Sequence, residues 1–389
     1  MTVKEDVLFE ITFDQLETGL RGVPVGYCVT SKVDPEKGLT YVDHPIVEMA
    51  TWMPERVIFL LYHGREGEVD EVKFLAQQLE MRAHLRPEVV KQIEQLPKKG
   101  DPMDLFSTAI LLAKLYEESG DYKEDCLNII AKAPEIAATV INHHAGWGKT
   151  PPSKPALGYM SNFAQMLKVP GHLSPNFAEI LQLFNILHYD HGGGNLSVFV
   201  GKAVASGLEG MYGSISAAMN ALAGPRHGKA NQNSLAFVQE VLEKVGEEGS
   251  AEQIRAFINQ KLYNHELIYG FGHAVLRVED PRAAIFYDLA TQLFPDHPLA
   301  RTALLLRTEV SHVLKERGKV ADPYANVDAI SGTVLSAAGF SYPEYYTVLF
   351  GLGRIVGIAI QILYERTEAR EGKGTPLLRP KYIYKPRKP

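Results

Sequence analysis

Apolar residues recur at helical spacing along most of the chain, and this pattern predicts a largely helical protein. Proline and glycine mark several of the expected helix boundaries, as at Gly224-Pro225 and Asp280-Pro281. Strand patterns are confined to the first part of the chain, in VLFEITF (7–13) and around GYCVT and LTYV, where we expect small hairpins. The segments with helical periodicity are 53–62, 68–81, 87–95, 102–117, 134–144, 176–188, 196–208, 210–223, 234–245, 251–263, 282–293, 298–316, 328–338 and 343–368.

One segment is apolar and long enough to resemble a membrane span, since residues 345–363 read YYTVLFGLGRIVGIAIQIL. Arg354 stands at its centre, where an arginine costs roughly 2.5–3.5 kcal/mol on insertion scales, and Gln361 adds to that cost. Because the sequence has no second span, we expect a core helix of a soluble protein and no membrane partner. A buried Arg354 would need an anionic partner, which is either a carboxylate of the protein or the carboxylate of a bound substrate.

The composition is that of an ordinary globular protein, with 389 residues of which 46% are apolar and 22% charged, enough for two or more domains. The net charge of −6 argues against a nucleic-acid-binding protein, which usually carries a basic face. The two cysteines, Cys28 and Cys126, cannot form a disulfide framework and indicate a reducing compartment. The acidic start of the chain resembles neither a secretory signal nor a transit peptide, so we expect a cytoplasmic protein.

Four short stretches in the second half of the chain place ionisable residues among glycines and apolar helix. They contain three histidines, one acid and two arginines, a set that suits the formation of an enolate from a weak carbon acid beside an anionic electrophile. Each stretch alone is a weak indication, and their joint occurrence is a stronger one. The stretches are ILHYDHGGGN (186–195), LAGPRHGKAN (222–231), YGFGHAVLRVEDPR (269–282) and NVDAISG (326–332), and the residues are His191, His227, His273, Asp328, Arg277 and Arg282.

His227 follows a helix stop and stands near the expected start of the next helix. Backbone N–H groups and the helix dipole disfavour the imidazolium form there, so a neutral ring could donate a hydrogen bond to a developing enolate. The alternative is a histidine that only caps a turn. Asp328 also has two interpretations, because it is either the cap of a helix that begins near 328 or a carboxylate base.

Other ionisable residues in these stretches suit the binding of anions. Three glycines after His191 let the backbone come close to a ligand, and Asp190 and His188 are alternative polar partners there. Arg277 and Arg282 are suited to holding the oxygens of a carboxylate or a phosphate.

Metal and nucleotide chemistry have little support in the sequence. His143 and His144 are adjacent and cannot share a helix face. His188 and His191 have a spacing that could bind zinc, but no acidic or cysteine partner stands at a suitable helical spacing from them. We therefore expect no metal site. The chain also lacks a phosphate-binding loop, a dinucleotide-binding glycine fingerprint and the nucleophile elbow of serine hydrolases.

With these motifs in this order, the chain resembles the citrate synthase family almost from end to end. The likeness begins with GLRGVPVGYC (19–28) and YVDHPIVEMA (41–50), runs through the four stretches and the apolar segment around Arg354, and closes with PLLRPK (376–381). The resemblance implies an all-α, two-domain homodimer with a minor N-terminal β element. The large domain would comprise 1–227 and 334–389, and a small, mobile domain would comprise 228–333.

The resemblance also implies a division of roles among the ionisable residues. Asp328 would remove a proton from the methyl group of acetyl-CoA, while His227 hydrogen-bonds the thioester oxygen and stabilises the enolate. His273 would polarise the ketone of oxaloacetate. The citryl-CoA formed would be hydrolysed in a closed site, with CoA as a co-substrate and with no permanently bound cofactor.

Further residues match positions at which the family binds its substrates. The carboxylates of oxaloacetate would be held by His191, Arg282 and Arg354, with Arg379 reaching in from the second subunit. The adenine of CoA would lie on the backbone around Ile268, Tyr269, Gly270, Phe271 and Gly272, and the CoA phosphates would contact Arg277 and Lys319.

The chain departs from the family pattern at a few positions. Arg226 and Lys229 flank His227 where many relatives have apolar or small residues, and they could bind a CoA phosphate or be solvated. Ala321 replaces a basic residue found in some relatives, so the phosphate contacts could be redistributed.

Two other functions remain open. The nearer one is a 2-methylcitrate synthase, which uses propionyl-CoA with the same residues. The other is a helical scaffold that keeps the fold without activity, and the intact His227, His273 and Asp328 argue against it.

Overall fold

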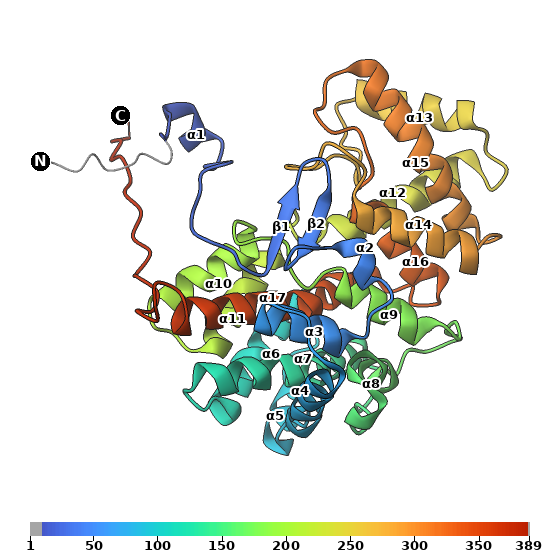
Figure 1. Cartoon of the computed structure of the whole chain (residues 1–389). Helices are drawn as coiled ribbons and strands as arrows, with labels where there is room; N and C mark the ends of the chain where they lie inside the picture. The colour runs from blue at the N-terminus through green and yellow to red at the C-terminus, as the bar shows by residue number, and fades with distance from the viewer. Residues whose placement is uncertain (1–9, 388–389) are drawn as a thin grey trace, which may run out of the picture.

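The computed structural model describes residues 10–387, and most of them lie in helices (Figure 1). The expected all-α fold with a minor N-terminal β element is confirmed. An antiparallel sheet contains β1 (Ser31–Asp34), β2 (Gly38–Tyr41) and β3 (His44–Pro45), in that order. The α-helices are α1 (Phe13–Glu17), α2 (Ile46–Met49), α3 (Pro54–His63), α4 (Val69–Arg82), α5 (Pro87–Ile93), α6 (Pro102–Glu117), α7 (Tyr122–Ala145), α8 (Tyr159–Met166), α9 (Phe177–Ile186), α10 (Leu196–Ser206), α11 (Met211–Leu222), α12 (Ala230–Val245), α13 (Ala251–Tyr263), α14 (Pro281–Leu293), α15 (Pro298–Arg317), α16 (Ser331–Ala337) and α17 (Tyr346–Thr367). Short 3₁₀ helices are η1 (Pro155–Leu157), η2 (Val327–Ala329) and η3 (Pro343–Tyr345).

Helix α17 runs through the centre of the fold and is covered on several sides by other helices (Figure 1). Its residues from 346 to 363 are buried except Phe350, which is half-buried. Within residues 10–387, Pro343–Thr367 alone is long and apolar enough to cross a bilayer, and 94% of its most apolar window is buried inside the protein. This burial fits the expected core helix. The helices that contact α17 are α3, α6, α7, α9, α10, α11 and α12.

Glycine allows the neighbours of α17 to approach it closely. A Cβ at Gly201 of α10 would lie 3.0 Å from Cγ2 of Ile358 and 3.2 Å from Cβ of Ala218 in α11. A Cβ at Gly357 would lie 2.8 Å from Cγ of Asp190, in the segment after α9. A Cβ would clash at Gly357 and would be unusually tight at Gly201, so glycine at these positions allows the helices to pack closely.

Helices α12 to α16 pack on one another and lie together on one side of the molecule (Figure 1). They coincide closely with 228–333, the segment expected to form the small domain. That boundary stays a prediction, and it would divide α16 near its first residues. Contacts of α12 with α17, of α14 with α2 and of α16 with α9 join this group to the rest of the molecule.

The hairpin of β1 and β2 lies against the segment that precedes α14. Its strands pair antiparallel over Ser31–Asp34 and Gly38–Tyr41. The backbone N–H of Arg277 donates a hydrogen bond to the carbonyl oxygen of Pro35 in the turn, at 2.8 Å. The hairpin is therefore attached to one of the stretches that carry candidate site residues.

The strands expected near the N-terminus are confirmed only in part, by the hairpin of β1 and β2. Within VLFEITF, residues 7–9 lie outside the described residues, 10–12 are not in a strand, and Phe13 begins α1. GYCVT (26–30) precedes β1 and is not assigned to a strand, although the backbone N–H of Val42 donates to the carbonyl oxygen of Thr30 at 3.0 Å. LTYV is confirmed in part because Leu39–Tyr41 belong to β2. Valine and aromatic residues favour a strand only where a neighbouring strand completes the pairing.

Helix α7 is longer than expected, because it continues through Pro134 instead of beginning there. A proline within a helix leaves the carbonyl four residues earlier without its usual N–H donor. Here that carbonyl belongs to Ile130, and the hydroxyl of Tyr159 donates to it at 2.9 Å. A side chain from α8, a helix that the periodicity did not predict, thus replaces the missing backbone hydrogen bond.

Candidate active site

The four glycine-containing stretches lie at helix ends beside α17. Nε of Arg354 donates to the carbonyl oxygen of His188 at 3.1 Å, which fixes the first stretch to α17. The hydroxyl of Thr347 donates to the carbonyl oxygen of Gly228 at 3.3 Å, which fixes the second. The third and fourth stretches are joined to each other by backbone hydrogen bonds. The third also contacts the first, because NH1 of Arg282 donates to the carbonyl oxygen of Leu187.

Arg354 is a buried cation with a free donor. Only 1% of the residue is exposed, and its guanidinium lies over the ring of Phe350, 4.8 Å from the centroid. Within the described part of the chain it forms no ion pair, and its terminal NH1 is buried without a hydrogen-bond partner. Burial lowers the pKa of Arg354 to about 10, so the side chain remains protonated at neutral pH. Of the two expected partners for this arginine, a protein carboxylate in direct contact is therefore excluded, and a bound anion remains.

Arg282 is equally buried but is already paired. Its Nε and NH2 donate to the two oxygens of Asp280 at 3.0 and 2.7 Å, and its NH1 donates to the carbonyl oxygen of Leu187 at 3.4 Å. Burial alone would lower the pKa of Arg282, but the carboxylate of Asp280 raises it above its usual range. Asp280 also accepts hydrogen bonds from the backbone N–H of Arg282 at 3.0 Å and of Val327 at 3.3 Å. The pair thus holds the start of α14 against the turn that carries Asp328.

His191 and His273 face each other with ring centroids 5.4 Å apart. Burial lowers the pKa of both histidines, and Arg282 lowers each further. The pKa of His273 falls to about 4. Both rings are therefore neutral at physiological pH, beside the two buried arginines. Such a place favours the binding of an anion, because its positive charge comes from guanidinium groups and its histidines are neutral hydrogen-bonding groups.

The hydrogen bonds of His273 define which ring nitrogen carries its proton. Nδ1 accepts from the backbone N–H groups of Val275 at 3.1 Å and Leu276 at 3.0 Å. A nitrogen that accepts from two N–H groups cannot carry the proton of a neutral imidazole. The proton is therefore on Nε2, which leaves an N–H donor directed away from the backbone.

His227 is neutral as well, and it contacts the beginning of α10. The backbone N–H of Ser197 donates to Nε2 at 3.3 Å, and the Ser197 hydroxyl lies 3.0 Å from the same nitrogen. Burial, with a smaller contribution from Arg354, lowers the pKa of His227 to about 4. The contact with a backbone donor places the ring proton on Nδ1. The backbone N–H of His227 closes a turn on Gly224 at 2.9 Å, so the turn is made by the main chain and the ring is free to act as a donor.

Asp328 lies in η2 and does not cap a helix, which corrects one of its two expected roles. The side chain of Asn326 is the cap, since its Oδ1 accepts from the backbone N–H of Asp328 at 3.0 Å. Among residues 10–387 no hydrogen bond to the Asp328 carboxylate forms. Burial raises the pKa of Asp328 to about 6, although the guanidinium of Arg282 acts in the opposite direction. A carboxylate with a raised pKa is a stronger base than usual and is still mostly ionised at neutral pH.

Asn326 also joins the Asp328 turn to the loop 268–272. Its side-chain amide donates to the carbonyl oxygen of Gly272 and its backbone N–H donates to that of Gly270, both at 2.9 Å. A Cβ at Gly270, whose φ is +82°, would lie 2.6 Å from Cα of Ala329. The loop expected to bind adenine and the turn that carries the expected base are therefore in direct backbone contact.

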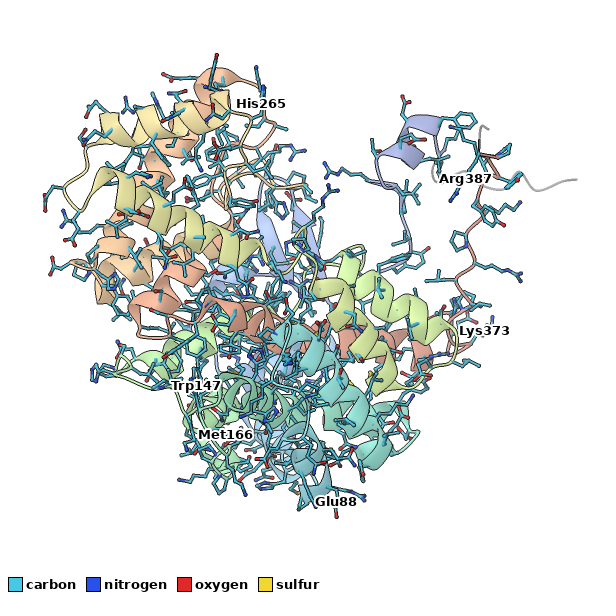
Figure 2. The ribbon with its side chains drawn as sticks, turned by 180° about the vertical axis from the view of Figure 1, so that it is seen from behind. Glu88, Trp147, Met166, His265, Lys373 and Arg387 are labelled. Atoms are coloured by element: carbon cyan, nitrogen blue, oxygen red, sulfur yellow. The ribbon has the colours of Figure 1, made fainter. Side chains whose placement is uncertain are left out.

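The remaining expected binding residues lie farther out. The guanidinium of Arg277 is exposed and folds back on the carbonyl oxygens of Val275 and Leu276, at 3.0 and 2.6 Å. Lys319 is exposed just after α15. Arg379 is exposed on the tail that follows α17, and this tail leads away from the helices (Figure 1). Seen from behind, this tail leads away from the helical body, as the labels of Lys373 and Arg387 show (Figure 2).

The residues described by the structure contain no group of three or more histidine, cysteine or acidic side chains that could hold a metal ion. His188 instead stacks on Phe184, with centroids 4.3 Å apart, and its Nδ1 lies 2.6 Å from the carbonyl oxygen of that residue. His143 contacts the carbonyl oxygen of Leu96 at 2.8 Å. These imidazoles are thus hydrogen-bonded within the core.

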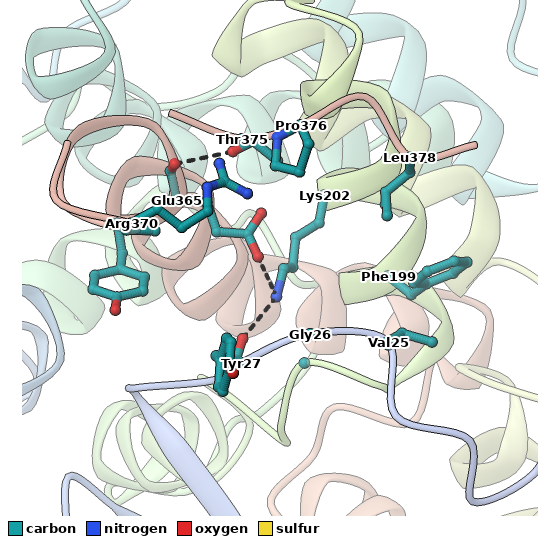
Figure 3. A pocket seen from close by; sticks show the side chains of 13 residues that line it. Val25, Gly26, Tyr27, Phe199, Lys202, Glu365, Arg370, Thr375, Pro376 and Leu378 are labelled. Atoms are coloured by element: carbon teal, nitrogen blue, oxygen red, sulfur yellow. Dashed lines mark hydrogen bonds and ion pairs between the residues drawn. The ribbon is translucent and has the colours of Figure 1, made fainter. Parts of the chain in front are cut away.

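A cavity of about 550 Å³ lies apart from these residues, between the N-terminal segment, α10 and the segment after α17 (Figure 3). Lys202 points into it, and its Nζ contacts Oε1 of Glu365 at 2.8 Å and the carbonyl oxygen of Tyr27 at 3.2 Å. None of the candidate catalytic residues lines this cavity. It therefore has no part in the site around Arg354.

Three residues that hold the site together were not predicted from the sequence. Ser197 contacts His227, Asn326 supports the Asp328 turn, and Asp280 pairs with Arg282. Asn326 and Asp280 stand two residues before the side chains that they support, at positions typical of helix caps. Ser197 is distant from His227 in the sequence and gave no local signal.

Comparison with known proteins shows similarity along almost the whole chain. A family model described as "Citrate synthase, C-terminal domain" matches residues 19–381. Citrate synthase 4, mitochondrial, from Arabidopsis thaliana is 36% identical over 97% of this chain and 83% of its own length. The mitochondrial citrate synthase of Daucus carota is 35% identical with the same coverage. A ternary complex of the citrate synthase of Thermoplasma acidophilum with carboxymethyl coenzyme A and oxaloacetate has a similar fold, with a TM-score of 0.80, 23% identity and coverage of 96% of this chain and 97% of that one.

These names correct the expectation of a cytoplasmic protein, since both curated relatives are mitochondrial. That expectation rested on the acidic start of the chain. Charge in a short segment can argue against particular leader types but cannot assign a compartment.

Proposed function

The chain belongs to the citrate synthase family, and we propose that the site beside α17 condenses acetyl-CoA with oxaloacetate and hydrolyses the citryl-CoA formed to citrate and CoA. The protein is thus an acyltransferase that converts the acyl group into an alkyl group on transfer, in the first step of the tricarboxylic acid cycle. CoA acts as a co-substrate, and no permanently bound cofactor takes part.

Arg354 provides the main support for this proposal. It is a buried guanidinium with an unpaired donor. Beside it lies a second buried guanidinium, that of Arg282, which the carboxylate of Asp280 already neutralises. A buried guanidinium whose donor has no partner among the described residues can be satisfied by a carboxylate of the substrate. Oxaloacetate is a dianion, so His191, Arg282 and Arg354 are proposed to hold its carboxylates.

His273 acts on the electrophile. Its Nε2–H donates a hydrogen bond to the ketone oxygen of oxaloacetate, which withdraws electron density from the carbonyl carbon and prepares it for attack. Because the backbone donors at Nδ1 fix this tautomer, the ring stays a neutral donor throughout the reaction.

Asp328 and His227 act on the nucleophile. Asp328 removes a proton from the methyl group of acetyl-CoA, and its raised pKa narrows the gap between the base and this very weak carbon acid. His227 donates from Nδ1 to the thioester oxygen as negative charge develops there. Ser197 acts from the other side of the ring by holding Nε2.

The acyl-CoA is proposed to lie along the loop of Ile268, Tyr269, Gly270, Phe271 and Gly272, with its phosphates near Arg277 and Lys319. Tyr269 is exposed on this loop, and Arg277 and Lys319 are exposed basic side chains that suit the binding of phosphate oxygens. Movement of 228–333 toward the rest of the chain would close the site and exclude water from the enolate.

The active form is proposed to be a homodimer. Helices α10 and α11 leave an apolar face that is only half-buried, formed by Phe199, Val200, Ala203, Val204 and Ala217. The tail after α17 exposes 89% of Tyr382 and 65% of Ile383, which a second copy would cover. Arg379 lies on that tail, and it is proposed to complete the oxaloacetate site of the neighbouring subunit.

The direct test is the release of free thiol from acetyl-CoA in the presence of oxaloacetate. We expect release that depends on both substrates, and folded protein without such release would overturn the proposal. The same assay with propionyl-CoA decides between this activity and that of a 2-methylcitrate synthase. We expect a higher kcat/KM with acetyl-CoA.

A further inference from the structure

Asp190 is a completely buried carboxylate that the proposed mechanism does not use. It stands directly before His191 and is 0% exposed. Among residues 10–387 it forms no ion pair with a lysine or arginine. A carboxylate in such a place is costly unless hydrogen-bond donors replace the water that it has lost.

The donors around Asp190 come from three parts of the chain. The hydroxyl of Ser31, in β1, donates to Oδ2 at 2.9 Å, and the hydroxyl of Thr30 donates to the same oxygen. The amide of Gln361, in α17, donates to both carboxylate oxygens at 2.9 and 3.0 Å. The backbone N–H of His191 donates to Oδ1 at 2.8 Å. The carboxylate therefore joins the hairpin, the central helix and the loop that carries His191.

The same loop is also held from other directions. The hydroxyl of Ser31 accepts a hydrogen bond from the backbone N–H of Gly192 at 2.8 Å, just beyond His191. On the other side, Nε of Arg354 donates to the carbonyl oxygen of His188 at 3.1 Å. Arg354 and Gln361 both belong to α17. The backbone N–H of Gly357, also in α17, donates to the carbonyl oxygen of Tyr189 at 3.1 Å. The loop 188–192 is thus attached to α17 at three points, and Asp190 is one of them.

We infer that Asp190 is a positioning residue for oxaloacetate binding, which fixes the backbone of His191 and sets its place relative to Arg354. The inference rests on the proposed function, since His191 and Arg354 are the groups assigned there to the substrate carboxylates. Asp190 would not touch the substrate, and it acts through the two residues that do.

A positioning role and a purely electrostatic role predict opposite signs. A negative charge beside an anion site repels the anion, so neutralising Asp190 would strengthen oxaloacetate binding if charge were its only effect. If the carboxylate positions His191, its replacement leaves buried donors without acceptors and weakens binding. The sign of the change therefore separates the two roles.

The experiment compares Asp190→Asn with the parent enzyme as purified full-length protein. Oxaloacetate affinity is measured by calorimetry without acyl-CoA, and kcat and both KM values are measured by thiol release. We expect the dissociation constant of oxaloacetate to rise about tenfold, which matches the cost of leaving a buried polar group unsatisfied. The KM for acetyl-CoA should stay within about twofold, because the loop 268–272 does not contact Asp190. Unchanged or tighter oxaloacetate binding in a folded variant would overturn the inference.

Asp125→Asn is the matched control. Asp125 is also buried, at 2% exposure, and its carboxylate accepts from the backbone N–H groups of Ser119 and Gly120 at 2.8 and 3.0 Å, in a part of α7 outside the site. This variant should lose stability but keep the oxaloacetate affinity of the parent. If it weakened oxaloacetate binding as much as Asp190→Asn, the effect would be general destabilisation and the inference would be wrong.

A second variant covers the case in which Asp190→Asn does not fold. Ser31→Ala keeps the charge of Asp190 but removes one donor to it and the acceptor for Gly192, so we expect oxaloacetate to bind about threefold more weakly. Parent-like affinity in Ser31→Ala would contradict the positioning role. If the parent enzyme itself released no thiol, the proposed function would be wrong. This assay is done before any variant is made, so the two failures are distinguishable.

Discussion

Asp280 holds the guanidinium of Arg282 with both carboxylate oxygens, at 3.0 and 2.7 Å, inside the protein. The pair is neutral as a whole, and its geometry is fixed before any substrate arrives. Arg354 has no such ion-pair partner among the residues described, and its NH1 is buried without a hydrogen bond. The two arginines are therefore expected to differ sharply in what their loss does to the fold.

Replacement of each arginine by methionine tests this difference. Arg282→Met leaves the buried Asp280 without its counter-ion and should destabilise the protein by about 3–5 kcal/mol. Arg354→Met removes an unpaired buried charge and should leave the free energy of unfolding nearly unchanged, while oxaloacetate binding weakens about 100-fold. Thermal unfolding and calorimetry check both results. Equal destabilisation by the two substitutions would contradict the assignment of Arg354 as the free cation.

Asp328→Ala should lower kcat by about a thousandfold, the scale expected when a general base is lost. Oxaloacetate binding should remain largely intact, because Asp328 is assigned to the other substrate. Steady-state kinetics and calorimetry measure the two effects separately. A comparable loss of both would show that the residue shapes the oxaloacetate site and is not the base.

The acid limb of the pH profile should report Asp328. Its pKa is raised to about 6 by burial, and the base works only when ionised, so kcat should fall about tenfold per pH unit below that value. His227 and His273 have a pKa of about 4 and stay neutral across this range, so they should not contribute. The profile is measured between pH 5 and 9 at saturating substrates. A constant kcat down to pH 5 would be incompatible with Asp328 as the base.

Ser197→Ala should lower kcat about tenfold with little change in oxaloacetate affinity, because the Ser197 hydroxyl helps to orient His227. Ser214→Ala in α11 provides a control, since that hydroxyl bonds only the carbonyl oxygen of Gly210 in its own helix region. The control should keep parent kinetics. A parent-like kcat for Ser197→Ala would mean that the backbone N–H of residue 197 suffices to hold the ring.

Mixed dimers test whether Arg379 acts across subunits. Arg379→Ala and Asp328→Ala homodimers should both be impaired. A hybrid of the two chains would combine an intact Asp328 with the intact Arg379 of the other chain at one of its two sites, so activity should recover to about half of the parent value. Hybrids made by subunit exchange and separated by different affinity tags allow the measurement. No recovery in verified hybrids would argue against a shared site.

The helical part of the fold could be predicted well because burial repeats at helical spacing. A single charge within an apolar helix was also informative, since Arg354 could be recognised as a buried cation without any structural information. The predictions that failed concern features that depend on residues distant in the sequence. Helix α7 continues through Pro134, where Tyr159 donates to the carbonyl of Ile130 that the proline leaves unpaired, and the periodicity of residues 122–145 cannot indicate that donor. The strand pattern of residues 10–13 failed for a similar reason, since pairing requires a neighbouring strand.

The candidate site shows the same limit. His227 and Asp328 stood out because glycine and helix boundaries surround them, but their supports were less visible. Asp328 could be mistaken for a cap because Asn326, two residues earlier, is the cap. The contact between Ser197 and His227 joins the beginnings of two separate segments, and only the packing of α10 beside α11 brings them together.

The hydrogen bonds of Asn326 have a consequence for how the enzyme would choose among thioesters. Since Asn326 joins the loop 268–272 to the turn of Asp328 by hydrogen bonds, the loop proposed to bind adenine and the proposed base are directly connected. A truncated thioester that lacks the adenine end would not contact the loop 268–272, so the turn of Asp328 would not be held in place. Such a thioester would be turned over slowly even at saturation. Small thioesters would then differ from acetyl-CoA in kcat more than in binding. Their wasteful hydrolysis would be suppressed without a pocket that keeps them out.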